Sequence, residues 1–70
     1  MDRLELAQAL EAEAERRSAR AAGITATAAG MTKTGELRVR RALEARSYQL
    51  ARGAATMRET ARYLRSDSGD

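Results

Sequence analysis

The 70-residue chain contains no cysteine, histidine, proline, tryptophan or phenylalanine, and its aromatic residues are two tyrosines. Without cysteine and histidine it has no disulfide, thiol nucleophile, imidazole base or zinc site of the usual ligand types. Its scattered glutamates lack a histidine partner for acid–base work, and its glycines do not form a phosphate-cradling loop. The sequence therefore predicts a protein that is not an enzyme and uses no cofactor or metal.

Large apolar side chains are also scarce. Seven leucines, Ile24 and Val39 are all that the chain has of Leu, Ile, Val and Phe, which is below the share of roughly a fifth expected of a folded chain. Alanine supplies most of the 43% hydrophobic fraction. The absence of proline and the abundance of Ala, Arg, Glu and Leu favour helix. We therefore predict an all-α protein whose core is marginal at this length.

The apolar spacing predicts two helices and one break. The first helix is expected over about residues 2–31, with acidic residues near its start, and the second over about residues 36–65. Residues 32–35 (Thr-Lys-Thr-Gly) form the clearest interruption, with Thr34 as the N-cap of the second helix. Residues 66–70 are expected to be a flexible polar tail.

Both predicted helices carry the alternating 4-3 spacing of a coiled-coil seam, in which every second seam position is small. Matching small with small and large with large gives residue pairs whose numbers sum to 67 or 68, so the chain must reverse near residue 34, at the break. The pairs are Ala7–Ala61, Leu10–Met57, Ala14–Ala54, Ala21–Ser47 and Ile24–Leu43. The pattern predicts an antiparallel two-helix hairpin over residues 1–65, completed as a dimer or four-helix bundle or by a partner.

An alternative interpretation is a parallel leucine zipper. Leu43, Leu50, Met57 and Leu64 recur every seven residues, and arginines precede them. A DNA-binding basic region, however, is a continuous helix of several turns, whereas this basic stretch is short and follows the break. The small seam residues also disfavour a parallel dimer, so the hairpin is the preferred interpretation.

Charge is distributed unevenly. Residues 1–15 carry a net charge of −4, from five acids and one arginine, and residues 37–65 carry +6, from eight arginines and two glutamates. The antiparallel register sets one group of acids beside one group of arginines: Glu5, Glu11, Glu13 and Glu15 beside Arg52, Arg58, Arg62 and Arg65. Such exposed pairs favour antiparallel over parallel pairing.

Arginines also suggest candidate binding positions. Arg17 lies on the seam in the layer of Leu50, with Glu13 one turn earlier. We expect it to extend to solvent along its stem, although it can also anchor an acidic partner. A possible basic surface comprises Arg38, Arg40 and Arg41. It leaves open a dimeric four-helix RNA-binding protein, which is not favoured because Tyr48 is the one aromatic residue that it could use for stacking.

Six large apolar residues fall outside the seam, which is many for a chain with so few large side chains. They are Leu4, Leu6, Leu37, Val39, Tyr48 and Tyr63. We predict that they bind a partner helix or a second copy, with the two tyrosines as the best energetic anchors because they combine area with a polar tip. The favoured function is a non-enzymatic interaction module, a helical-hairpin adaptor or chaperone.

Four residues give this chain a resemblance to one family. It opens with Met-Asp-Arg-Leu4-Glu5 and carries Tyr48-Gln49 early in the second helix, and so resembles the needle-subunit co-chaperones of type III secretion systems. The resemblance implies a hairpin that joins a larger chaperone and keeps the needle subunit unpolymerised. Relative to that family, the chain has fewer long aliphatic residues and more Arg and Ala.

A weaker resemblance is to hairpin substrates of type VII secretion. Tyr63-x-x-x-Asp67 matches their Tyr-x-x-x-Asp/Glu export signal, but the turn lacks their Trp-x-Gly motif. This makes an exported or structural hairpin, such as a phage or assembly component, the second candidate function.

The acidic start of the chain does not match a secretory signal peptide. The longest uncharged stretch, residues 21–32, is too short and polar to cross a bilayer. We expect a cytoplasmic protein without a membrane span or a small-molecule substrate, with non-classical export left open.

Overall fold

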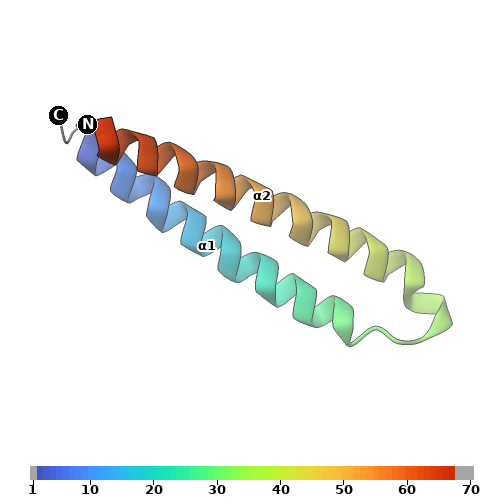
Figure 1. Cartoon of the computed structure of the whole chain (residues 1–70). Coiled ribbons are helices and arrows are strands. Elements are labelled where there is room, and N and C mark those ends of the chain that lie inside the picture. Colours follow the sequence, from blue (N-terminus) through green and yellow to red (C-terminus); the bar gives the residue numbers. More distant parts are fainter. Residues whose placement is uncertain (1, 68–70) are drawn as a thin grey trace.

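The computed structural model describes residues 2–67, and two long antiparallel helices lie side by side in it (Figure 1). Helix α1 spans Arg3–Ala29, a short 3-10 helix, η1, spans Thr34–Glu36, and helix α2 spans Leu37–Asp67. The described part contains no strand, and the hairpin extends over 56 × 14 × 13 Å. The prediction of an all-α helical hairpin is confirmed.

Helix α1 is capped at its start and tightens at its end. The Asp2 carboxylate accepts a 2.8 Å hydrogen bond from the backbone N–H of Glu5, which satisfies one of the free amide groups of the first turn. The helix ends at Ala29, two residues before the predicted end. It stops there because the N–H of Met31 bonds the carbonyl of Ala28 at 3.0 Å, the shorter spacing of a terminal 3-10 turn.

The turn differs from the prediction at Thr34, which was expected to cap the second helix. Thr34 is the first residue of η1 and provides no side-chain cap. The carboxylate of Glu36 accepts a 3.1 Å bond from the N–H of Lys33, and the N–H of Glu36 donates back to the Lys33 carbonyl at 2.9 Å. The prediction of Thr34 as the N-cap was therefore wrong. The reciprocal hydrogen bonds join Lys33, the residue before η1, to Glu36, the last residue of η1.

Helix α2 is longer than predicted. It continues through Ser66 and Asp67, whereas the sequence predicted a flexible tail over residues 66–70. The hydroxyl of Ser66 donates a 3.2 Å bond to the carbonyl of Tyr63, so this residue supports the last turn. Residues 68–70 of the predicted tail lie outside the described part.

The core is a seam of small side chains between the two helices. Leu50, at 8% exposure, is the one large side chain of the described part that is nearly buried, and no large side chain there is fully buried. The other large seam residues are half-buried. The buried small residues are Ala7, Ala14, Ala21, Ala28, Ser47, Ala54 and Ala61. Small residues at alternate seam positions allow close helix approach, but they remove little apolar area from water.

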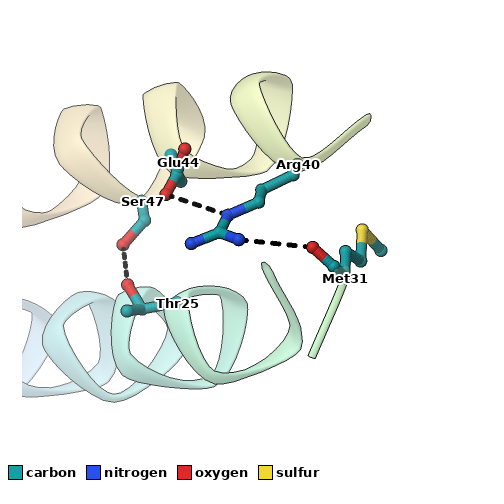
Figure 2. Close-up of polar contacts among 5 residues, drawn as sticks. All are labelled: Thr25, Met31, Arg40, Glu44 and Ser47. Atoms are coloured by element: carbon teal, nitrogen blue, oxygen red, sulfur yellow. Dashed lines mark hydrogen bonds and ion pairs between the residues drawn. The ribbon is translucent and has the colours of Figure 1, made fainter. Parts of the chain in front are cut away.

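A polar contact within the seam supports the predicted register. The hydroxyl of Ser47 donates a 3.0 Å hydrogen bond to the backbone carbonyl of Ala21, and these two residues were predicted to face each other. The Ser47 and Thr25 hydroxyls are also 2.6 Å apart (Figure 2). Ser47 is 8% exposed, so the one polar residue among the small seam positions is buried with its hydrogen bonds made.

The charged side chains only partly follow the predicted complement. Two bonds, of 2.6 and 2.8 Å, join the guanidinium of Arg65 to the carboxylate of Glu11 across the helices. Arg58 donates instead to the hydroxyl of Ser18 at 3.0 Å. Glu13 pairs within its own helix rather than with α2. The predicted opposition of acids and arginines thus produces one bidentate ion pair between the helices, at Glu11. Arg58 and Glu13 bind other residues instead.

Candidate functional site

The six apolar residues predicted to bind a partner are the exposed large apolar residues of the described part. Their exposed fractions range from 41% for Leu6 to 66% for Tyr63. Four of them lie within the first two turns of a helix, near the termini or the turn, whereas Tyr48 and Tyr63 lie further along α2.

One set, the terminal apolar group, consists of Leu4, Leu6 and Tyr63. Leu4 and Leu6 belong to the first turns of α1, and Tyr63 belongs to the last turns of α2. These two helix ends are adjacent in the fold (Figure 1). The group lies next to the ion pair of Glu11 with Arg65, which holds α2 against α1 near this end.

The other set, the turn apolar group, consists of Leu37, Val39 and Tyr48. Leu37 and Val39 lie at the start of α2, beside η1, and Tyr48 follows further along α2. Leu37 and Val39 border a shallow hollow at the turn, whose other lining residues are Thr34, Gly35, Arg38 and Arg41. This group thus mixes exposed apolar surface with exposed arginines.

Tyr48 is positioned by its own helix. The residue is 63% exposed, and the guanidinium of Arg52 lies 5.8 Å from the ring centroid. This is a cation–π distance, and the four-residue spacing places both side chains on one face of α2. The two side chains thus form an exposed pair of an aromatic ring and a cation on α2.

The predicted basic surface divides into two parts. Arg40 turns inward, where its Nη1 donates to the carbonyl of Met31 at 3.3 Å and its Nε pairs with Glu44 at 3.5 Å (Figure 2). It therefore closes the end of α1 against α2, as a cation at a helix C-terminus commonly does. Arg38 and Arg41 remain exposed on the turn. Only these two present the charge predicted for this surface.

Arg17 keeps its predicted neighbour. Its Nε lies 3.6 Å from the Glu13 carboxylate, and its side chain is 40% exposed. The guanidinium does not simply extend to solvent, because its Nη1 occupies the space beside Gly53 of the facing helix. Arg17 thus crosses the hairpin on the side that also carries Leu50.

Two residues near Arg17 were not singled out from the sequence. Arg20 of α1 and Arg46 of α2 border the same hollow as Arg17. The signal was present in the register, since the numbers 20 and 46 sum to 66, close to the sum that pairs Ala21 with Ser47. Each arginine by itself is typical of a solvated helix face, and their proximity follows only from the fold.

The remaining candidates add little chemistry. Tyr63 of the possible export signal is exposed, while the side chain of Asp67 lies outside the described part. Residues 2–67 hold no cluster of three or more side chains suited to a metal ion. None of the helices in that range has a stretch apolar and long enough to traverse a bilayer.

The ionisable groups of the Glu11–Arg65 pair are perturbed. The hydrogen bond from Arg65 lowers the pKa of Glu11, against a smaller opposing effect of desolvation. The same bond raises the pKa of Arg65. Both changes favour the charged forms, as expected for a structural ion pair.

Comparisons of the chain with protein-family models, with curated proteins and with solved structures found no significant match.

Proposed function

We propose that the chain is a non-enzymatic protein–protein interaction module, a helical-hairpin adaptor or chaperone that binds a helix of a partner protein. The observation that carries this proposal is the location of the large apolar side chains. Six of them are 41–66% exposed, whereas the seam between α1 and α2 buries mostly alanine. A hairpin with this distribution leaves large apolar side chains that a partner can bury.

The exposed area supports the same proposal. The accessible surface is 5267 Å², whereas a folded monomer of this mass is expected to expose about 4,300 Å². The excess of about 1,000 Å² is close to the roughly 800 Å² that each partner contributes to a protein interface of standard size. A helix laid along the hairpin would cover surface of this extent.

Tyrosine side chains are the expected anchors of such an interface. Tyr48 and Tyr63 have large exposed areas, lie in different halves of α2, and belong to a residue type enriched among interface hot spots. A partner helix that contacts both must run along α2 for about 22 Å, at 1.5 Å per residue. Leu4 and Leu37 extend the contact towards the two ends.

A secretion chaperone is one specific form of this function. It is supported by the resemblance through Leu4, Glu5, Tyr48 and Gln49 to co-chaperones of type III secretion needle subunits. Leu4, Tyr48 and Gln49 are exposed on the hairpin, where they are available to a partner. On this proposal, the partner is a second chaperone and the cargo is a subunit kept from polymerising.

The test compares partner capture by matched variants. The tagged chain and a Tyr48→Ala/Tyr63→Ala variant are used as baits in lysate of the native host, with Gln8→Ala as a control at an exposed polar position. Circular dichroism establishes that all three baits are equally helical. We expect the wild type and the control to enrich the same protein. The double variant should capture about tenfold less of that protein or lower, since a hot-spot truncation costs about 2 kcal/mol or more.

The proposal fails if the wild type and the double variant capture the same proteins to the same extent. It also fails if the wild type sediments as a stable monomer and no protein is enriched over an unrelated helical bait. Sensitivity of the captured complex to nuclease, with a steep salt dependence, would point to the RNA-binding alternative instead.

A further inference from the structure

Three arginines from both helices surround one hollow on a flank of the hairpin, away from the terminal apolar group. The hollow has a volume of about 350 Å³, at the lower end of the range for ligand sites. Its lining residues, which we call the arginine notch, are Glu13, Arg17, Arg20, Arg46, Gln49 and Leu50. The lining thus includes three arginines and one glutamate.

That carboxylate is already engaged. Glu13 lies 3.2 Å from Arg16 and 3.6 Å from Arg17, so its charge is shared. Within residues 2–67 neither Arg20 nor Arg46 has an acidic partner. Like charges brought together on facing helices oppose the fold, and departures of this kind from local consistency concentrate at functional sites. An anion in the notch would remove the repulsion.

A glycine makes room for one of the three arginines. A Cβ atom at Gly53 would lie 3.1 Å from Nη1 of Arg17, closer than side chains ordinarily approach. Glycine inside a helix is unfavourable relative to alanine, yet position 53 lies in the middle of α2. The missing side chain lets Arg17 reach across the seam, while Glu13 holds it from the other side.

We propose that the arginine notch binds a single phosphate group, as inorganic phosphate or a phosphate monoester. Its lining carries a net charge of +2, from three arginines and one glutamate, which matches a phosphate dianion. Guanidinium forks offer paired N–H donors suited to phosphate oxygens, and three of them exceed what the two oxygens of a carboxylate can accept. The amide of Gln49 adds a neutral donor.

The surroundings favour one isolated phosphate over a nucleic-acid backbone. One heptad towards the turn, Arg20 and Arg46 are succeeded by the uncharged Thr27 and Val39. One heptad towards the termini, Glu13 and Gly53 occupy the same positions. A nucleic-acid backbone needs cations repeated along its length. At these two heptad positions the flank provides a pair of arginines only at Arg20 and Arg46. None of the six exposed apolar residues lines the notch, although Gln49 beside Tyr48 does, and the proposal does not depend on the interaction function.

The test is a titration of the full chain with inorganic phosphate and with O-phosphoserine, at constant ionic strength set by chloride. Arginine Nε–Hε signals in ¹⁵N spectra report binding at the guanidiniums directly. We expect saturable shifts at Arg17, Arg20 and Arg46 and none of similar size at Arg38. The phosphate and phosphoserine arms then distinguish a free anion from a phosphorylated side chain.

Three variants separate the notch from general charge. Arg46→Gln should weaken phosphate binding by about tenfold or more, because a charge-assisted fork is lost, while Arg38→Gln, which removes the same charge from the turn, should change it less than about twofold. Gly53→Ala should also weaken binding, because the new methyl displaces Arg17, while the melting temperature stays equal or rises. If Gly53→Ala binds phosphate less tightly while its melting temperature is equal or higher, unfolding cannot explain the loss of binding.

The proposal is overturned if Arg38→Gln and Arg46→Gln weaken binding equally, which would show diffuse charge attraction. It is also overturned if phosphate and phosphoserine produce no saturable shift while a single-stranded oligonucleotide does. Should Arg46→Gln lose helicity, Arg20→Gln is the second variant with the same expectation.

Discussion

The Ser47 hydroxyl donates a 3.0 Å hydrogen bond to the Ala21 carbonyl, and it also lies 2.6 Å from the hydroxyl of Thr25. Alanine repeats every seven residues along the seam, so alanine alone fits several registers shifted by a heptad. Ser47 differs, because only the observed register brings it beside Thr25. The pair therefore supplies register information that the alanines lack.

A double-mutant cycle on Ser47→Ala and Thr25→Ala tests this pair. We expect the single and double variants to reveal a coupling free energy of about 0.5–1.5 kcal/mol, the net contribution of a hydrogen bond in a protein. Urea unfolding followed by circular dichroism provides the measurement. A control cycle combines Ser47→Ala with Thr56→Ala. The Thr56 hydroxyl bonds the carbonyl of Arg52 within its own helix, so this cycle should show no coupling. Strict additivity in the first cycle would contradict the register role.

Enlarging a buried alanine should separate the helices. Ala54 is 0% exposed on the seam, whereas its neighbour Ala55 is exposed. We expect Ala54→Leu to reduce the free energy of unfolding by about 1–3 kcal/mol through overpacking, and Ala55→Leu to change it by less than about 0.5 kcal/mol. Thermal and urea unfolding of the two leucine variants make the comparison. Equal stabilities would mean that the helices do not meet closely at this level.

The seam and the turn were predictable because they rest on periodicity. Small residues at fixed spacing in two segments have few ways to face each other, and one of those ways placed the reversal at the Thr-Lys-Thr-Gly break. The helix boundaries were less predictable because side chains decide them. Glu36, rather than Thr34, closes the turn, and the Ser66 hydroxyl bonds the Tyr63 carbonyl in the last turn of α2.

The candidate binding surfaces were predicted only in part, for a different reason. Burial followed from the seam, so the six exposed apolar residues were identified correctly as exposed. Long arginine side chains choose among several partners within reach. Spacing indicated neither that Arg40 would turn to the carbonyl of Met31 nor that Arg20 and Arg46 would border one hollow.

Arg40 and Arg38 should differ in their contribution to stability. Arg40 contacts the carbonyl of Met31 and the carboxylate of Glu44, whereas Arg38 is exposed at the turn. We expect Arg40→Ala to lower the free energy of unfolding by about 0.5–1.5 kcal/mol, and Arg38→Ala to leave it within about 0.5 kcal/mol of the wild type. Urea unfolding at fixed ionic strength measures both. A larger loss for Arg38→Ala would show that the charge at the turn, and not the contact with α1, is what matters.

The ion pair of Glu11 with Arg65 should make the stability depend on pH in the acid range. The hydrogen bond from Arg65 lowers the pKa of Glu11 from its ordinary value of 4.5. A carboxyl group whose pKa is lower in the folded state stabilises the fold fully above its unfolded pKa, and this contribution disappears as the pH falls through the folded pKa. The stability difference between the wild type and Glu11→Gln should therefore be constant above about pH 5.5 and decrease below 4.5. Glu59→Gln, which removes an exposed glutamate on α2, serves as the control and should not reproduce this decrease. Urea unfolding from pH 7 to pH 3 provides the measurement. A stability difference between the wild type and Glu11→Gln that grows on acidification would contradict the prediction.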